Sequence, residues 1–460
     1  MRILCNLPLE CFDDRAALRG VELCTFGPPE RMLVDGVRFG FDVAFDPSTQ
    51  SWRELAAALP DGFAPDLVLI YWPDQEPLPE GLEQCPVPVV GVVSDYNLTL
   101  PQLAGLWPFF DSLLCDRAGV ELFERLTFAD VRYWCQYAHK RPFHRLYDNA
   151  AGRDVDVGFA GNLNPVVQRE RAGWIQRVDQ LKERGVRVDV RADVYGEAYG
   201  RFLNRCRIGW NRSVRGEMNL RAFEVPACGA LLLMERENQE VRDFFVPDEE
   251  CVLYGEDDFE AVVARLLGDP ARTKRIAAAG LRRVQDHRLG NRLHELAPLA
   301  AGPLRRPEST AAERTLGRAV AMMTTWAGED AIARAAMDAA RAAPADPRAL
   351  NALAMATLRW RGGAGAGEAI ELFRKAMAYS ADYLPAAVNL QQLAEAAGND
   401  ALRRTASAAR ERRLADASSW EAIDGPMLPF GYGVDVVDRS LALQRAVRDG
   451  STAAFVAALR

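Results

Sequence analysis

The sequence predicts an α/β protein with two doubly wound, Rossmann-like parallel sheets, followed by an all-α region of helical repeats. Two stretches, residues 1–150 and 151–300, alternate short apolar strands with helices. Such alternation is typical of parallel sheets that helices cover on both faces. A Pro- and Gly-containing linker follows at 301–312, and the chain then becomes Ala-rich and helical over 313–460.

Composition narrows the function classes. The 460 residues carry a net charge of −8, which argues against a nucleic-acid partner. The chain has four His, a small supply for metal chemistry, and nine scattered Cys, none in a Cys-x-x-Cys pair, so we expect no metal and no disulfide framework. We also expect no cofactor. No apolar run reaches the ~18 residues of a membrane span. We therefore expect a cytoplasmic protein without a transmembrane segment.

The first stretch contains several short runs of buried-strand character, separated by helices and turns. Continuous apolar runs of this kind are typical of central parallel strands. We expect strands at Arg2–Cys5, Asp66–Trp72, Val87–Val93, Ser112–Cys115 and Val131–Tyr137, helices at 52–59 and 119–126, and a strand pair or a strand with a turn at Asp35-Gly36 within 32–45.

Two acidic residues follow strands of this first stretch. Asp74 comes after one central run and Asp95 after the next. Ligands bind beyond the carboxyl ends of parallel strands, so either carboxylate could act as a general base. A helix N-cap or turn role is the other interpretation; it is favoured for Asp74 and about equally supported for Asp95. The basic segment His139–Arg145 could contact a phosphate, although a solvated connector is the preferred reading.

The second stretch begins with a strand over 154–160, after which Gly161 and Asn162 form a loop before a helix over 166–184. Backbone N–H groups at such a turn can bind an anion. The turn has no GxGxxG fingerprint and the chain has no P-loop. The pair Asp154-Val-Asp156 resembles a metal-binding Asp-x-Asp, but its alternating positions favour strand entry.

The stretch Gly216–Gly229 has the strongest pattern for ligand binding. A polar loop opens a helix between two apolar runs, near 208 and at 230–234. Arg221 stands in the first helical turn, where a guanidinium could grip a diphosphate bidentately. Glu224 lies one turn further on, and its carboxylate could accept hydrogen bonds from sugar hydroxyls. On these residues alone, a plain amphipathic helix is an equally good interpretation.

The C-terminal region repeats at a spacing of about 38 residues, because Asn351 corresponds to Asn389 and Ala331 to Ala369. Tetratricopeptide units have 34 residues, and Gly362–Gly367 accounts for the excess. Helical hairpins of this kind stack into a solenoid with a concave binding face. We therefore expect a TPR-like helical domain over 313–460, capped by Ser418–Arg460.

The second stretch resembles group 1 glycosyltransferases of the GT-B fold, in the branch that includes the spore maturation protein CgeB. The matching segments occur in family order. They are Asp156–Asn162, Tyr195-Gly196, Ile208 with Asn211–Ser213, Met218–Glu224, Ala227–Ala230, and Asp286-His287 with Arg292. The first stretch is similar only in layout; its Asp95 resembles an acidic strand-end residue of that branch, and Tyr96 replaces a second one.

The resemblance implies a nucleotide-diphosphate sugar held by residues 151–300, with the acceptor on the side of residues 1–150. It implies that Glu224 binds the ribose and that Asn219, Leu220 and Arg221 surround the diphosphate, with Gly161 and Asn162 closing over it. It places Tyr195 and Gly196 near the base, and includes Asn211 among the binding residues. The first Glu of the family's Glu-x7-Glu pattern is out of register at Glu217, so its role is not carried over.

The leading hypothesis is a glycosyltransferase, a hexosyltransferase by expectation, that needs no metal. A helix N-terminus and an arginine would stabilise the charge on the departing diphosphate, and Asp95 is the candidate base. The acceptor would be a protein or glycan engaged by the helical repeats. Two alternatives remain: a non-catalytic scaffold of the same fold that binds a protein partner, and an epimerase or phosphorylase.

Overall fold

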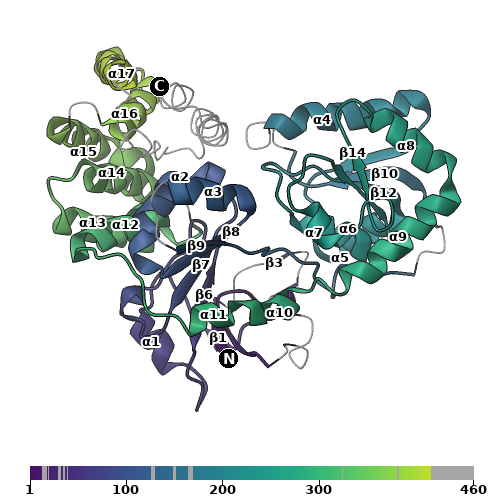
Figure 1. Ribbon diagram of the computed structural model, residues 1–460. Helices are drawn as coiled ribbons and strands as arrows, with labels where there is room; N and C mark the ends of the chain where they lie inside the picture. Colours follow the sequence, from purple (N-terminus) through teal and green to yellow (C-terminus); the bar gives the residue numbers. More distant parts are fainter. Residues whose placement is uncertain are drawn as a thin grey trace. The chain divides into compact units, whose positions relative to one another are not determined.

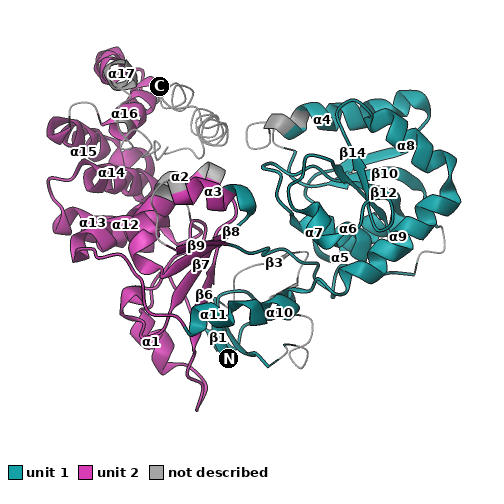
Figure 2. Cartoon of the chain, in the orientation of Figure 1, with its two compact units in different colours: residues 1–44, 115–118, 133–301 teal, residues 45–114, 119–132, 302–460 magenta. Residues whose placement is uncertain are grey.

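The computed structural model describes residues 1–12, 18, 20–28, 33–34, 37–38, 40–125, 130–148, 152–163, 169–323, 325–380 and 383–415. Figure 1 shows the chain, and Figure 2 colours its two compact units. Unit 1 comprises residues 1–44, 115–118 and 133–301, and unit 2 comprises 45–114, 119–132 and 302–460. The turn at Asp35-Gly36, the start of the helix expected at Val166 and the cap Ser418–Arg460 lie outside the described residues. The domain boundaries expected from the sequence stay predictions.

The first sheet has seven strands in the described residues, in the order β5-β2-β1-β6-β7-β8-β9. The pairs β1·β2, β2·β5, β6·β7 and β7·β8 are all parallel. The parallel pairing of β6, β7 and β8 agrees with their apolar sequences. The strands are β1 (Arg2–Cys5), β2 (Glu22–Gly27), β5 (Val43–Ala44), β6 (Leu67–Tyr71), β7 (Val89–Val92), β8 (Ser112–Cys115) and β9 (Asp130–Tyr133), and a separate antiparallel pair joins β3 (Leu33–Val34) to β4 (Val37–Arg38). The helices are α1 (Trp52–Ala57), α2 (Tyr96–Leu106) and α3 (Arg117–Arg125), with single turns at Leu9–Cys11, Leu82–Gln84 and Trp107–Phe109.

Two of these elements, β2 and α2, were not among those predicted. Helix α2 contains Pro101 and Gly105, which are breaking signals in an isolated sequence. Gly105 has a packing reason, because a Cβ there would lie 3.0 Å from the backbone of Gly317. Tertiary packing against a later helix therefore stabilises α2 where local propensity does not.

The second sheet lies wholly in unit 1 and has five parallel strands in the order β11-β10-β12-β13-β14. Its strands are β10 (Val155–Ala160), β11 (Val188–Arg191), β12 (Cys206–Trp210), β13 (Leu231–Glu235) and β14 (Val252–Tyr254). Its helices are α4 (Arg169–Asp179), α5 (Gly196–Arg205), α6 (Leu220–Ala227), α7 (Val241–Phe244), α8 (Phe259–Gly268) and α9 (Pro270–Val284), and α10 (Leu289–Arg292) and α11 (Ala297–Ala300) follow, with single turns at Gln180–Arg184 and Leu293–Leu296.

Side chains of this sheet alternate between two buried cores. Leu231 and Leu233 of β13 pack with residues of α4 and α8, whereas Leu232 and Met234 pack with residues of α5, α6 and α7. Figure 1 shows helices on both faces of the sheet. The period-two alternation thus produces the doubly wound layers that the sequence predicts.

Helix α6 is held at its carboxyl end by a single arginine. The Arg153 guanidinium donates hydrogen bonds to the carbonyls of Leu203 and Cys206 at the end of α5, and to the carbonyl of Cys228 at the end of α6. A cation at helix C-termini offsets the negative end of the helix dipole. This contact fixes α5 and α6 relative to β10, which begins two residues after Arg153.

The predicted linker at 301–312 is bound along the first sheet in unit 2. The Arg306 guanidinium donates to Asp111 Oδ2 at 2.9 Å and to the carbonyls of Glu83 and Val87 at 2.6 and 2.7 Å. The Arg305 backbone N–H donates to Asp111 Oδ1 at 2.6 Å. Arg305 and Arg306 of this segment are therefore held within unit 2 and are not part of a mere spacer.

The helical region follows, with its own apolar core. Asn351 and Asn389, which the repeat aligns at a spacing of 38, are both fully buried, and Asn389 Nδ2 donates to Asn351 Oδ1 at 3.0 Å. The contact explains why the same residue recurs, while the tetratricopeptide assignment itself stays a prediction. The helices are α12 (Ala311–Met322), α13 (Glu329–Ala342), α14 (Pro347–Arg361), α15 (Ala366–Tyr379), α16 (Leu384–Ala396) and α17 (Asp400–Ala415), with a single turn at Gly362–Gly365. None of the helices described is both long and apolar enough to cross a membrane.

Candidate functional site

The carboxyl edge of the five-stranded sheet brings together several residues that the sequence singled out. Gly161 follows β10, Asn211 follows β12, and Asn219 and Arg221 open α6, which lies between β12 and β13 in the chain. All belong to unit 1. These residues, with the strand end at Ala160, are called the strand-end cluster below.

Arg221 is the centre of the strand-end cluster. Its Nε and Nη2 donate to the carbonyl oxygen of Ala160 at 3.1 and 2.7 Å, and its Nη1 donates to Asn211 Oδ1 at 3.0 Å. The guanidinium carbon lies 4.2 Å from the ring centroid of Phe159, in cation–π geometry. Arg221 is half-buried. Its hydrogen-bond partners are neutral, so no hydrogen-bonded carboxylate from the described residues occupies the guanidinium.

Gly161 lies directly beside the guanidinium end of the Arg221 side chain. A Cβ at position 161 would lie 2.2 Å from Arg221 Nη2, well inside contact distance. The loop after β10 therefore approaches the guanidinium as closely as the chain allows. Asn162, the next residue, is exposed.

Asn211 and Asn219 hold each other across the cluster. Asn211 Nδ2 donates to Asn219 Oδ1 at 3.1 Å, and Asn219 Nδ2 donates to Asn211 Oδ1 at 3.2 Å. Asn219 is also the N-cap of α6, since its Oδ1 accepts the backbone N–H of Ala222. Leu220 is then the first helical residue and is half-buried. The N-terminus of α6 is thus fixed to the end of β12.

Glu224 lies one turn down α6 and is buried at 7% exposure. Its Oε1 is 3.6 Å from His144 Nε2. The Lys140 backbone N–H donates to His144 Nδ1 at 3.0 Å, so the proton of the neutral ring sits on Nε2 and faces the carboxylate. Burial raises the pKa of Glu224, against the opposing charges of Arg221 and Lys140 and a hydrogen bond from Tyr199.

The segment 139–145 is only partly the solvated connector that we preferred from its sequence. Its Arg141, Pro142 and Arg145 are exposed, but the two histidines are 2% and 5% exposed. Burial lowers the pKa of His139 and of His144 to about 3, so both rings are neutral at pH 7. The sequence correctly indicated the exposed charged residues of this segment. It did not indicate that His144 would be a buried, neutral ring beside Glu224.

Tyr195 and Gly196 lie after β11, the strand that neighbours β10. Tyr195 is the N-cap residue of α5 and is 52% exposed, and its hydroxyl donates to Asp193 Oδ1 at 3.2 Å. Asp193 and Gly196 have positive φ angles of 53° and 54°. The chain therefore turns sharply on both sides of an exposed aromatic ring that follows the carboxyl end of β11.

The Glu217 side chain contacts the backbone of its own loop. In the sequence, Glu217 lies one position away from the first Glu of the Glu-x7-Glu pattern. Its carboxylate accepts the backbone N–H of Arg215 at 2.6 Å and of Val214 at 3.3 Å, and it is 5% exposed. The Arg215 guanidinium also pairs with buried Asp116 at 3.1 Å. Burial raises the pKa of Glu217, with Asp116 acting in the same direction and Arg215 opposing. These contacts give Glu217 a structural task in this loop.

Sequence reasoning missed Arg171 at this edge and assigned no role to Arg212, which lies in the matching segment Asn211–Ser213. The Arg171 guanidinium carbon lies 5.8 Å from the ring centroid of Phe159, and its Nη2 donates to the carbonyl of Arg212 at 3.2 Å. Arg212 in turn stacks on Trp174 at 4.6 Å. Phe159 lies in the matching segment Asp156–Asn162, but sequence reasoning assigned it no role of its own. The alternation of β10 was the available signal, since it places Phe159 on the face where α4 packs.

Other family-matching residues act on the packing of α6. The Arg292 guanidinium lies 5.1 Å from the Phe223 ring centroid and donates to the carbonyls of Cys135 and Tyr137. The His287 ring also lies against Phe223.

Asp154 and Asp156 pair with Arg205 and Arg187 respectively, which agrees with strand entry and not with metal binding.

Asp95 and Asp74 lie in unit 2. Asp95 occupies the N-cap position of α2 without a capping hydrogen bond from its side chain, and its Oδ2 accepts from Gln75 Nε2 at 3.4 Å. Asp74 is fully buried, and its Oδ2 accepts from the Thr99 hydroxyl at 2.6 Å. Burial raises the pKa of Asp74 to about 6, with Asp95 adding to the effect. The two carboxylates therefore differ in environment, and Asp95 is the more accessible.

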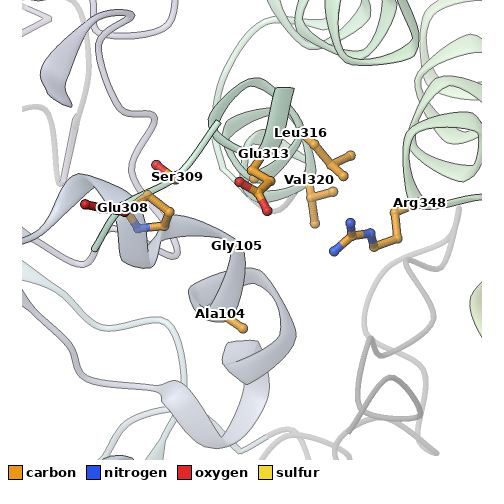
Figure 3. A pocket seen from close by; sticks show the side chains of 10 residues that line it. Ala104, Gly105, Glu308, Ser309, Glu313, Leu316, Val320 and Arg348 are labelled. Atoms are coloured by element: carbon orange, nitrogen blue, oxygen red, sulfur yellow. The ribbon is translucent and has the colours of Figure 1, made fainter. Parts of the chain in front are cut away.

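A pocket of about 270 Å³ in unit 2 is lined by none of the predicted site residues (Figure 3). Ala104 and Gly105 of α2 line it together with Leu316 and Val320 of α12, and charged Glu313 and Arg348 lie at its side. Within the described part of the chain, no group of three or more His, Cys, Asp or Glu residues is arranged to hold a metal ion.

Comparison with known proteins gives one sequence match. Residues 141–297 match the family model described as glycosyl transferase-like. This range contains the whole strand-end cluster, Tyr195 and Glu224. No protein of curated function matches the sequence. The family model does not resolve branches, so a CgeB-related placement stays a prediction.

Several solved structures are similar over 65% of this chain. They include sucrose-phosphate synthase from Thermosynechococcus elongatus (12% identity, 98% of that chain covered, TM-score 0.40) and an alpha-glucosyltransferase in complex with UDP and DNA (12%, 99%, 0.44). Anabaena HepE in complex with UDP-glucose is a third (11%, 100%, 0.37). With TM-scores below 0.5, these similarities do not bear on the function of this chain, which is argued from its own residues.

Proposed function

We propose that this protein is a glycosyltransferase that moves a sugar from a nucleotide-diphosphate donor to a hydroxyl acceptor, and that its strand-end cluster binds the donor diphosphate. The observation that carries the proposal is the fixed position of Arg221 at the carboxyl edge of the five-stranded sheet, bonded to Ala160 and Asn211. The glycosyl transferase-like match covers the same residues.

The chemistry follows from the position of the cation. In sugar transfer, negative charge builds up on the departing diphosphate while the sugar becomes oxocarbenium-like. Arg221 and the N-terminus of α6 can stabilise that charge without reorganising, because their contacts already hold them in place. We infer that the reaction needs no metal for this reason. Arg171, whose guanidinium also lies near the Phe159 ring, is proposed as a second cation near the diphosphate.

The remaining site residues have complementary roles in the proposal. Glu224 accepts hydrogen bonds from the ribose hydroxyls, and Gly161 and Asn162 border the diphosphate. Exposed Tyr195 stacks on the nucleobase, with Gly196 permitting the turn beside it. Asp95 is proposed as the base that activates the acceptor hydroxyl. The acceptor is proposed to be a protein or glycan engaged by the helical region, and the transferred sugar to be a hexose.

A thermal-shift screen tests donor binding, followed by a transfer assay. The full-length protein is heated with sugar nucleotides based on uridine, guanosine, adenosine and thymidine diphosphate, without added metal and with EDTA. We expect one nucleotide class to raise the Tm, and Glu224→Gln to reduce that rise. Mass spectrometry of co-incubated acceptors then detects added hexose. A protein that none of the nucleotides stabilises would contradict the proposal.

A second candidate is a non-catalytic scaffold that retains the donor fold. The involvement of Glu217 in its own loop favours it, because the residue nearest the family's first Glu contacts the backbone of Val214 and Arg215. Tight nucleotide binding with neither hydrolysis nor transfer, together with a stable protein partner, would support this reading. Sugar-nucleotide epimerisation without any acceptor would instead indicate an epimerase.

A further inference from the structure

The segment 235–240, between β13 and α7, forms a buried polar network beside the loop that leads into α6. Glu235, the last residue of β13, accepts both the backbone N–H and the hydroxyl of Ser213 through Oε1. Glu235 and Ser213 are 3% and 9% exposed. The start of the loop 213–218 is therefore tied to the end of the neighbouring strand.

Asn238 is the middle of this network and is 2% exposed. Its Nδ2 donates to the carbonyl of Glu217 at 2.7 Å. Its Oδ1 accepts the backbone N–H groups of Glu240 and Val241 at 3.0 and 2.8 Å, which starts α7. The two ends of one amide thus serve two tasks: the oxygen orders α7, and the nitrogen holds the loop.

Glu240 completes the network two residues later. Its Oε2 accepts the backbone N–H of Met218 at 3.0 Å, and its Oε1 accepts that of Arg117 at 3.0 Å. Met218 is fully buried and directly precedes Asn219, the N-cap of α6. Any movement of Met218 would move the residue that pairs with Asn211 and so the helix that carries Arg221.

We propose that Asn238 and Glu240 are positioning residues that hold loop 213–218 in place, so that Asn219 and Arg221 are preset for the donor diphosphate. This inference rests on the proposed function for the ligand, but the ordering of the loop is testable without any ligand. An unpaired carboxylate or amide is most costly when it is buried, so breaking the hydrogen bonds of these groups is unfavourable. The network is therefore rigid. Preset geometry is what transition-state stabilisation by fixed groups requires.

Two isosteric variants separate positioning from general stability. Asn238→Asp keeps the Oδ1 contacts that start α7 but replaces the donor to Glu217, Ser213 and Glu235 with an acceptor. Glu240→Gln keeps one accepting oxygen and loses the other. The matched control is Asn389→Asp, which also places a carboxyl at a buried Asn, in the helical region far along the chain. All three are made in the full-length protein.

Hydrogen–deuterium exchange is the first measurement. We expect Asn238→Asp and Glu240→Gln to speed exchange in peptides covering 213–219 while β10 and β13 stay as protected as in the wild type. The Asn389→Asp control should leave 213–219 unchanged. Unchanged exchange at 213–219 in both variants, or equal acceleration across the whole of unit 1, would overturn the proposal.

Nucleotide affinity is the second measurement, with UDP, GDP, ADP and dTDP as the probes. For the nucleotide that the wild type binds, we expect Asn238→Asp to raise Kd by about tenfold, the equivalent of one lost hydrogen bond. Asn389→Asp should leave Kd unchanged. In steady-state transfer assays with the corresponding sugar nucleotide, the fold increase in KM should exceed the fold decrease in kcat.

A Kd equal to that of the wild type in both variants would overturn the inference. Absence of nucleotide binding in the wild type would instead contradict the proposed function, and the exchange data would still decide the positioning role.

Discussion

Arg221 is held by groups that orient it without neutralising it. A carbonyl oxygen, an amide oxygen and an aromatic face all attract a guanidinium, yet none carries a full negative charge. In the described part of the chain, no ion pair between Arg221 and a carboxylate is formed at hydrogen-bond distance. An arginine used only for packing could equally have been neutralised by an acid, so this partner set favours anion binding.

Gly161→Ala tests the close approach of the loop to Arg221. The added Cβ would meet Nη2 at 2.2 Å, so the guanidinium must leave the Ala160 carbonyl or the loop must shift. We expect nucleotide affinity to fall by about tenfold or more, the scale of one charged hydrogen bond. Isothermal titration measures it. The control is Gly173→Ala in α4, where the Cβ meets nothing within 4 Å and affinity should not change. Unchanged affinity in Gly161→Ala would show that the close contact is incidental.

At the scale of elements, strand–helix alternation predicted both parallel sheets, because buried strands must be apolar on both faces. It did not predict α2, whose Pro and Gly signals are overruled by the contact with α12. For the site, the pattern around Gly216–Gly229 led to Arg221 and Glu224. Arg171 and Asn238 could not be found in this way, because their roles depend on contacts between segments distant in sequence.

The connection 301–312 also looks different at this scale. Pro, Gly and charge predicted a linker, but Arg306 is only 11% exposed at its side chain and meets Asp111, which is 3% exposed. A charged residue in a connecting segment indicates solvent exposure only when water, and not another residue, interacts with its charge. Here the partner is a buried carboxylate at the start of β8.

Arg306→Ala tests this connection. Removing the guanidinium leaves the Asp111 carboxylate buried without its cation, which typically costs about 3–5 kcal/mol of unfolding free energy. Urea denaturation should show that loss in the transition that reports unit 2. The control is Arg305→Ala, since that side chain is 53% exposed and should cost under about 1 kcal/mol. Equal effects of the two substitutions would mean that the ion pair contributes nothing specific.

At the scale of the whole molecule, the free energy of unfolding depends on pH through buried histidines and a buried carboxylate. Neutral His139, His144 and His287 must take up protons to unfold in acid, so their contribution is lost as pH falls below about 6.5. Asp74 acts in the other direction. Its folded pKa of about 6 exceeds the ordinary 3.8, so the folded state binds more protons in that window and stability falls as pH rises through it.

Asp74→Asn isolates the acidic contribution, because the histidines cancel between variant and wild type. At pH 4 the two proteins should differ little through charge. At pH 8 the free energy of unfolding of the variant, relative to the wild type, should be up to about 3 kcal/mol higher than at pH 4. This difference is the free-energy equivalent of the raised pKa of Asp74. Urea unfolding at both pH values measures the difference. A difference that does not grow with pH would mean that Asp74 stays ionised in the fold at no cost.

The central claim is that the strand-end cluster binds a nucleotide diphosphate through Arg221. Isothermal titration of the wild type, Arg221→Lys and Arg221→Ala with UDP, GDP, ADP and dTDP tests it most directly. We predict one-to-one binding of at least one nucleotide to the wild type, weakened in Arg221→Lys because the bidentate fork is lost, and abolished in Arg221→Ala while the fold persists by circular dichroism. Wild-type affinity in Arg221→Ala, or a folded wild type that binds none of the four, would contradict the account.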